Sequence, residues 1–129
     1  MTHSNSLPFP SQIFPNTVAE KLDDSNYLIW KQQVEPDIKS HKLHRFVVNP
    51  VIPSKFLIKE DCVSGSVNPA YEEWEVEDQI LLSWLQSTLS KTILLRVLGV
   101  VHSYQVWEQI HDHFFTQTKA RARQLRTDL

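Results

Sequence analysis

Histidine pairs are the first candidates for metal chemistry in this chain, but their spacing does not favour a metal site. His111 and His113 are two positions apart, so on a helix their side chains point about 160° away from each other. His41 and His44 are three positions apart, with no carboxylate or thiol at ligand spacing. Histidines on a helix surface explain both pairs, and we expect no bound metal.

The other reactive groups lack the partners that catalysis needs. Cys62, the single cysteine, follows Asp61 and has no cluster of cations near it in the sequence to stabilise a thiolate. The two glycines of the chain cannot build a phosphate-binding loop or a nucleophile elbow. We therefore expect no enzyme, no cofactor and no small-molecule substrate.

An acidic cluster could in principle offer paired carboxylates for acid–base catalysis. It lies at the start of a predicted helix, where the positive end of the helix dipole favours acidic side chains. A solvated helix start explains most of this cluster, which consists of Glu72, Glu73, Glu75, Glu77 and Asp78.

A basic segment near the end of the chain is the candidate for binding nucleic acid. Residues 119–129 contain Lys119, Arg121, Arg123 and Arg126 against Asp128 alone. Three of these cations share one helix face, and each contact with a phosphate releases about one counterion. The whole chain has a net charge of −2, so only a local patch can bind RNA. A solvated helix face is the alternative interpretation.

Composition limits the class of protein. The chain has 129 residues, of which 41% are hydrophobic and 22% charged, which is typical of one globular domain. Two glycines and seven prolines favour helices over a turn-rich sheet protein. No apolar run reaches the roughly 18 residues of a membrane span, and one cysteine forms no internal disulfide. We expect a protein of the cytoplasm or nucleus with no membrane partner.

Hydrophobic periodicity predicts an all-α fold, a compact bundle of about five helices. Residues 1–17, with three prolines, predict a flexible, disordered arm. A first helix, capped by Ser25, ends near Ser40, and Pro36 either kinks it or divides it in two. Its apolar face consists of Tyr27, Trp30, Val34 and Ile38. Residues 43–68 predict a long proline-containing connection packed by its own apolar residues, among them Phe56, Leu57 and Ile58.

A second helix starts at Asn68 and Pro69, which have the residue types favoured at the cap and first position. Two apolar stripes predict that this helix is central and covered on both sides. The wider stripe consists of Tyr71, Trp74, Leu81, Leu82, Leu85 and Leu89, and the second of Val76, Ile80 and Trp84. We expect Trp84 to lie in the core; the alternative is a surface anchor for a partner.

The remaining helices are predicted from caps and stops. Ser90 begins a short helix that reaches Val97 and is ended by Gly99. Ser103 begins another, and Thr118 is a candidate cap for a fifth helix that reaches Leu129 with no stop signal. We therefore expect the domain to be a fragment of a longer chain. The apolar stripe of the helix from Ser103 consists of Val106, Trp107, Ile110 and Phe114.

The order of four segments carries a family resemblance. Residues 21–30, 68–85, 103–115 and 119–126 resemble successive motifs of the Gag polyproteins of plant copia-type LTR retrotransposons. Those motifs are K-L-x-x-x-N-Y-x-x-W, N-P-x-Y-x-x-W with D-x-x-L-x-S-W-L, S-x-x-x-W-x-x-L-x-x-x-F, and S-R-A-R-x-x-Q-L-R. Ile110 replaces the common Leu, and Lys119 stands where Ser is frequent.

The resemblance implies that residues 18–129 are a capsid-like helical domain, whose role is self-assembly into a particle around the element's RNA. Zinc knuckle, protease, integrase and reverse transcriptase segments do not occur within the 129 residues, so neither their activities nor their zinc are carried over. The motif residues expected in the helical core are Tyr27, Trp30, Tyr71, Trp74, Leu81, Trp84, Leu85, Trp107 and Phe114.

Three hypotheses follow from the sequence. The first is a non-enzymatic domain that associates with other Gag copies. The second is an RNA-binding module that uses the basic segment. The third is a domesticated Gag-like domain that binds a host protein in a groove between helices, and the genomic neighbourhood would separate it from an element remnant.

Overall fold

The computed structural model describes residues 18–128, apart from the side chains at 120–122 and 124–128. Six α-helices and no strand occur in this part of the chain, which confirms the all-α prediction. The expected arm, residues 1–17, lies outside the described residues. The helices are α2 (Tyr27–Ser40), α3 (His44–Val47), α4 (Lys59–Ser64), α5 (Pro69–Ser87), α6 (Lys91–Arg96) and α7 (Ser103–Asp128).

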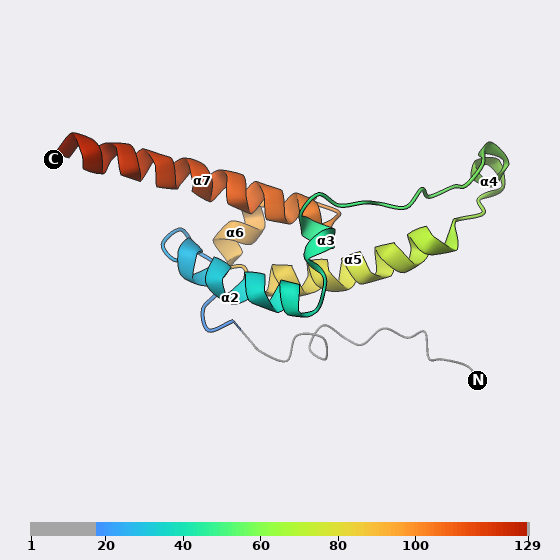
Figure 1. The fold of residues 1–129 in the computed structure, drawn as a ribbon, viewed down its shortest axis with the longest axis horizontal. Coiled ribbons are helices and arrows are strands. Elements are labelled where there is room, and N and C mark those ends of the chain that lie inside the picture. Colours follow the sequence, from blue (N-terminus) through green and yellow to red (C-terminus); the bar gives the residue numbers. More distant parts are fainter. Residues whose placement is uncertain (1–17, 129) are drawn as a thin grey trace.

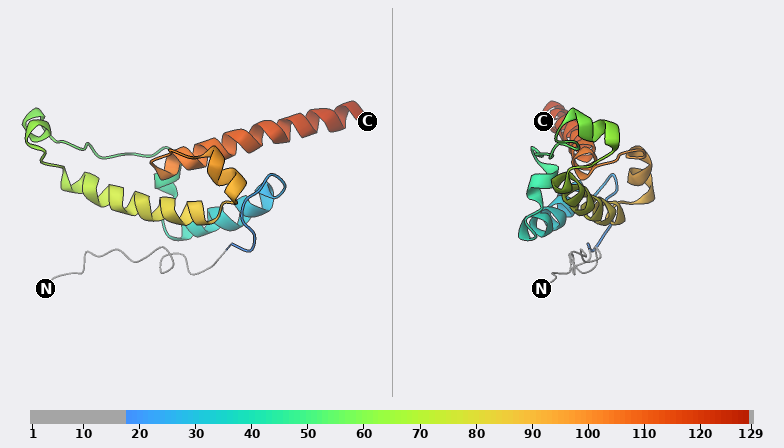
Figure 2. Two further views of the ribbon diagram at one scale, coloured as in Figure 1. Left: turned by 180° about the vertical axis from the view of Figure 1, so that it is seen from behind. Right: turned by 90° about the vertical axis from the view of Figure 1, so that its right-hand side faces the viewer.

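Two long helices, α5 and α7, determine the shape of the molecule (Figure 1). The first half of α7 packs against α5 and α3, and α3 also contacts α2. The second half of α7 extends away from the other helices, and α4 lies at the opposite end of the molecule (Figure 2). The core therefore occupies the middle, and both ends are slender.

The first predicted helix is one continuous helix, so Pro36 lies within α2 without dividing it. Its apolar face is buried as predicted through Trp30, Val34 and Ile38. The predicted cap at Ser25 is wrong, because Asn26 occupies the cap position. The Ser25 hydroxyl instead donates to the Asp23 carboxylate at 2.7 Å, within the turn before the helix.

The connection between the first two predicted helices is not packed by its own residues, and that prediction is wrong. It contains α3, whose Phe46 and Val47 are buried in the main core, and α4. The Phe46 ring stacks on Trp74 with centroids 6.1 Å apart. Leu57 and Ile58 are 68% and 57% exposed. A single turn of helix has no measurable period, so α3 could not be detected from spacing.

The predicted start of α5 is confirmed, since the Asn68 side chain accepts a hydrogen bond from the Ala70 N–H at 3.1 Å. The prediction that both sides of this helix are covered is wrong. Trp84 is buried, but Val76 is 49% exposed and Ile80 is half-buried. Val76, Ile80 and Trp84 are four positions apart, and four residues turn a helix by about 400°. Each of these residues therefore lies about 40° further around the axis than the one before, from solvent toward the core.

The two helices predicted after Gly99 are a single helix, α7. Thr118 does not cap, because its hydroxyl donates to the Phe114 carbonyl at 2.8 Å within the helix. The Ser103 hydroxyl does not cap either, since it donates to the Asp78 carbonyl at 2.8 Å. Ser90 does occupy the position before α6, although its side chain forms no cap hydrogen bond.

The segment before α2 is attached to the end of α5 by backbone hydrogen bonds. The Leu22 N–H donates to the Thr88 carbonyl at 2.8 Å, and the Ser90 N–H donates to the Leu22 carbonyl at 2.9 Å. The Trp30 indole N–H donates to the buried Thr88 hydroxyl at 3.1 Å. These bonds bring the first two motif segments together.

Candidate assembly surfaces and nucleic-acid interface

The motif residues come together in one aromatic core. The rings of Tyr27 and Phe114 stack with centroids 4.7 Å apart, and Trp30 lies 5.9 Å from Trp107. Tyr27 and Tyr71 are half-buried. The other motif residues are buried: Trp30, Trp74, Leu81, Trp84, Leu85, Trp107 and Phe114. These side chains hold the helices in place around one shared core.

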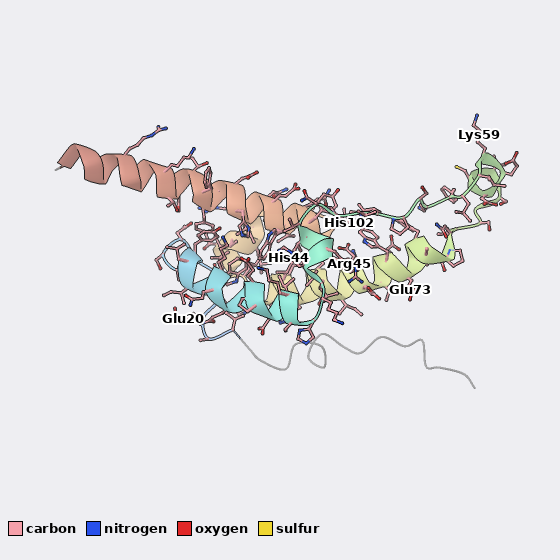
Figure 3. The ribbon with its side chains drawn as sticks, viewed as in Figure 1. Glu20, His44, Arg45, Lys59, Glu73 and His102 are labelled. Carbon is pink, nitrogen blue, oxygen red and sulfur yellow. The ribbon has the colours of Figure 1, made fainter. Side chains whose placement is uncertain are left out.

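Asp78 is fully buried, although the sequence analysis assigned it to a solvated helix start. Its carboxylate accepts a hydrogen bond from the Ser103 N–H at 3.1 Å and lies 2.8 Å from Nδ1 of His102. Figure 3 shows His102 where α7 begins. Asp78 therefore caps α7 from another helix. The signal was present, because position 78 falls on the same apolar stripe as Trp74, Leu81 and Leu85.

The rest of the acidic cluster faces outward. Glu77 lies 3.9 Å from the Arg45 guanidinium. Glu72, Glu73 and Glu75 are exposed, and within the described part of the chain no cationic side chain forms an ion pair with them. Figure 3 shows Glu73 on the first half of α5, away from the packed middle of the molecule. This half of the helix thus carries uncompensated negative charge.

A shallow groove runs along the outer side of α5, with a volume of about 330 Å³. Gln79, which lines the groove, donates a hydrogen bond to the Val101 carbonyl at 2.9 Å. We call this surface the α5 outer face. It consists of Glu72 together with the groove residues Glu75, Val76, Gln79, Ile80 and Ser83.

A second groove, of about 270 Å³, lies between the start of α2 and the middle of α7. Leu28 and Ile29, which are 69% and 60% exposed, line it together with Phe114. Two adjacent large apolar side chains in solvent are a feature of surfaces that bind other proteins. This groove is a second candidate for contacts between copies.

The histidine pair on α7 does not converge, as its spacing predicted, but His111 is half-buried rather than fully exposed. Its ring lies edge-on to Tyr27, 5.6 Å away, and its Nδ1 is 2.8 Å from the Trp107 carbonyl. Burial lowers the pKa of the His111 imidazole below its ordinary value. His113 instead lies 3.6 Å from Asp24. Within residues 18–128, no group of three or more potential metal ligands is close enough to hold an ion.

The basic segment lies on the part of α7 that extends beyond the core (Figure 1). Lys119 and Arg123 are exposed. The Lys119 ammonium lies 4.7 Å above the ring of Phe115, which is itself 59% exposed. The side chains of Arg121 and Arg126 lie outside the described residues. We call the described surface, Phe115, Lys119 and Arg123, the α7 end.

No helix in the described part of the chain is long and apolar enough to cross a membrane.

Comparison with known proteins relates the chain to mobile elements. It is 27% identical over 109 residues to the retrovirus-related Pol polyprotein from transposon RE1 of Arabidopsis thaliana. It is 26% identical over 106 residues to the corresponding polyprotein from transposon RE2 of the same plant. The similarity supports a retrotransposon origin.

The matches cover 84% and 82% of this chain but only 7% of each polyprotein. The chain therefore resembles one short segment of each polyprotein. No family model matches the chain, and no solved structure matches it.

Proposed function

We propose that this chain is the capsid-like part of a retrotransposon Gag protein, a non-enzymatic module that associates with other copies of itself to enclose the element's RNA. The observation that carries the proposal is the aromatic core, in which the segments that resemble Gag meet through the pairs Tyr27–Phe114 and Trp30–Trp107. Such packing is expected if the motifs define one domain.

Exposed apolar surface supports self-association. Large apolar side chains lie in solvent on five of the described helices, among them Leu28 on α2, Val76 on α5 and Phe115 on α7. Surfaces of this kind gain free energy when a partner covers them. Several separate surfaces on one small domain suit an assembly in which each copy has more than one neighbour.

Sedimentation velocity of the 129-residue chain tests this proposal. We expect the weight-average sedimentation coefficient to rise between about 10 μM and about 1 mM, the range of weak protein contacts. A coefficient that stays at the value of a 15.1 kDa monomer throughout would contradict self-association.

A second candidate function is RNA binding by the basic segment. It is favoured by the exposure of Lys119 and Arg123 on a helix that extends beyond the core. Affinity for single-stranded RNA should fall steeply between about 50 and 200 mM salt, because phosphate contacts release counterions.

The matched variants for this test each remove three cations. We expect Arg121→Ala/Arg123→Ala/Arg126→Ala to lose most of the affinity for RNA. The control, which removes exposed lysines elsewhere, should bind as the wild type does; it is Lys55→Ala/Lys59→Ala/Lys91→Ala. Equal losses in both variants would exclude a specific site on α7.

A further inference from the structure

The α5 outer face points directly away from the core. Val76 and Leu85 are nine positions apart, which places them on opposite sides of the helix at about 100° per residue. Leu85 is fully buried, whereas Val76 is 49% exposed above the groove. Val76, with the half-buried Ile80 beside it, therefore lies on the side of α5 that is turned away from the core.

The charges around this face indicate the chemistry of its partner. Glu72 and Glu75 lie beside Val76 and have no cationic partner among the described residues. A matching partner needs an apolar side chain next to cations. The α7 end has this composition, since the exposed Phe115 ring is followed by Lys119 and Arg123 on one row of the helix.

The spacing of the two surfaces also agrees. Glu72 and Ile80 are eight positions apart, and so are Phe115 and Arg123, which is about 12 Å along each helix. On α5 the acidic Glu72 comes before the apolar Ile80. On α7 the apolar Phe115 comes before the cationic Arg123, so the charged residue is last. Antiparallel packing therefore places Phe115 against Ile80 and Arg123 against Glu72.

One molecule cannot make this contact with itself. The first turn of α7 is attached to Asp78, in the middle of α5. Arg123 lies twenty residues further along a continuous helix, about 30 Å away. Figures 1 and 2 show α7 extending away from the first half of α5. The partner must be another copy.

We propose that the α7 end of one copy packs antiparallel on the α5 outer face of the next. This inference rests on the proposed function, because it names the interface through which copies associate. The two surfaces are different, so a pair joined by one such contact still has one surface of each kind open. Further copies can therefore add head-to-tail into a chain or a ring.

Mixing two variants tests the proposal. The face variant is Glu72→Lys/Val76→Lys, and the end variant is Phe115→Ala/Lys119→Gln/Arg123→Gln. All five positions are exposed, so we expect the melting temperature to stay close to that of the wild type. Each variant alone should remain a monomer where the wild type forms larger species, with its affinity weakened at least about tenfold. An equimolar mixture should form dimers and stop there, because it contains one intact face and one intact end.

The outcomes separate this inference from the proposed function. If the wild type stays monomeric, both fail. If the wild type associates and both variants associate equally well, only the head-to-tail contact is refuted. An end variant that loses RNA binding but keeps wild-type association would likewise overturn the contact and assign the α7 end to RNA. Val63→Lys, at a 91% exposed position on α4, is the matched control and should behave as the wild type.

Discussion

Replacing Asp78 tests how the two long helices are joined. The carboxylate is fully buried and accepts hydrogen bonds from the Ser103 N–H at 3.1 Å and from His102 Nδ1 at 2.8 Å. Asp78→Ala removes the cap of α7 and leaves the Ser103 N–H without its partner. We expect unfolding to become easier by about 3 kcal/mol, from a cap of about 0.5–2 kcal/mol and a charge-assisted hydrogen bond of about 1.5–3 kcal/mol.

The assay is thermal denaturation followed by circular dichroism, with urea denaturation as a check. A loss of about 3 kcal/mol should lower the melting temperature of a domain of this size by roughly 10 °C. Asp78→Asn keeps an oxygen for the Ser103 N–H and should lose less than half as much free energy. Glu73→Ala, which removes an exposed carboxylate from the same helix, is the control and should change stability by no more than about 0.5 kcal/mol. The reasoning is refuted if Asp78→Ala melts together with Glu73→Ala.

Three further predictions concern stability. Trp84→Ala should cost about 3–5 kcal/mol in chemical denaturation, whereas Val76→Ala should cost less than about 1 kcal/mol, because only Trp84 is buried; equal losses would contradict the described orientation of α5. Thr88→Val should cost about 1–3 kcal/mol, since it leaves the Trp30 indole N–H buried without its acceptor; unchanged urea denaturation would show that this hydrogen bond contributes nothing. Burial lowers the pKa of His111, so below its ordinary value of 6.5 the unfolded chain binds more protons and stability falls as the pH drops from about 7 to 5; urea denaturation of His111→Phe should show a weaker pH dependence, and an unchanged slope would contradict it.

Local signals in the sequence were sufficient for much of the fold. Asn68 and Pro69 predicted the start of α5 because capping and a fixed φ angle depend only on neighbouring residues. The buried face of α2, with Trp30 and Val34, was predicted because hydrophobic periodicity needs only one helix. Predictions of this type do not depend on where other helices lie.

The features that sequence reasoning missed depend on contacts between distant residues. Asp78 resembles its acidic neighbours in composition, and only the arrival of α7 explains its burial. Phe46 lies in a helix of four residues, too short for periodicity, and is buried because Trp74 is beside it. Thr118 has a hydroxyl that either caps a helix or bonds back within one, and the two alternatives have the same sequence signature.

The candidate surfaces divide in the same way. The basic composition of the α7 end could be read from the sequence, and so could the acidic composition of α5. The exposure of Val76 could not, because the spacing of Val76, Ile80 and Trp84 suggested a buried stripe. Each four-residue step from Val76 to Trp84 turns about 40° around the helix axis, so one end of the row is buried and the other is exposed. Which end is buried depends on the orientation of the helix, which the spacing does not give.

The central claim is that this domain associates with itself through its exposed helix surfaces, and its amide NMR spectrum recorded over a range of concentrations tests that claim most directly. Between about 20 μM and about 1 mM, we expect the amide signals of residues 72–83 on α5 and 115–123 on α7 to shift progressively, while those of the buried face of α2 stay in place. A spectrum that does not change over this range would contradict self-association. Shifts confined to other surfaces would contradict the contact between α5 and α7.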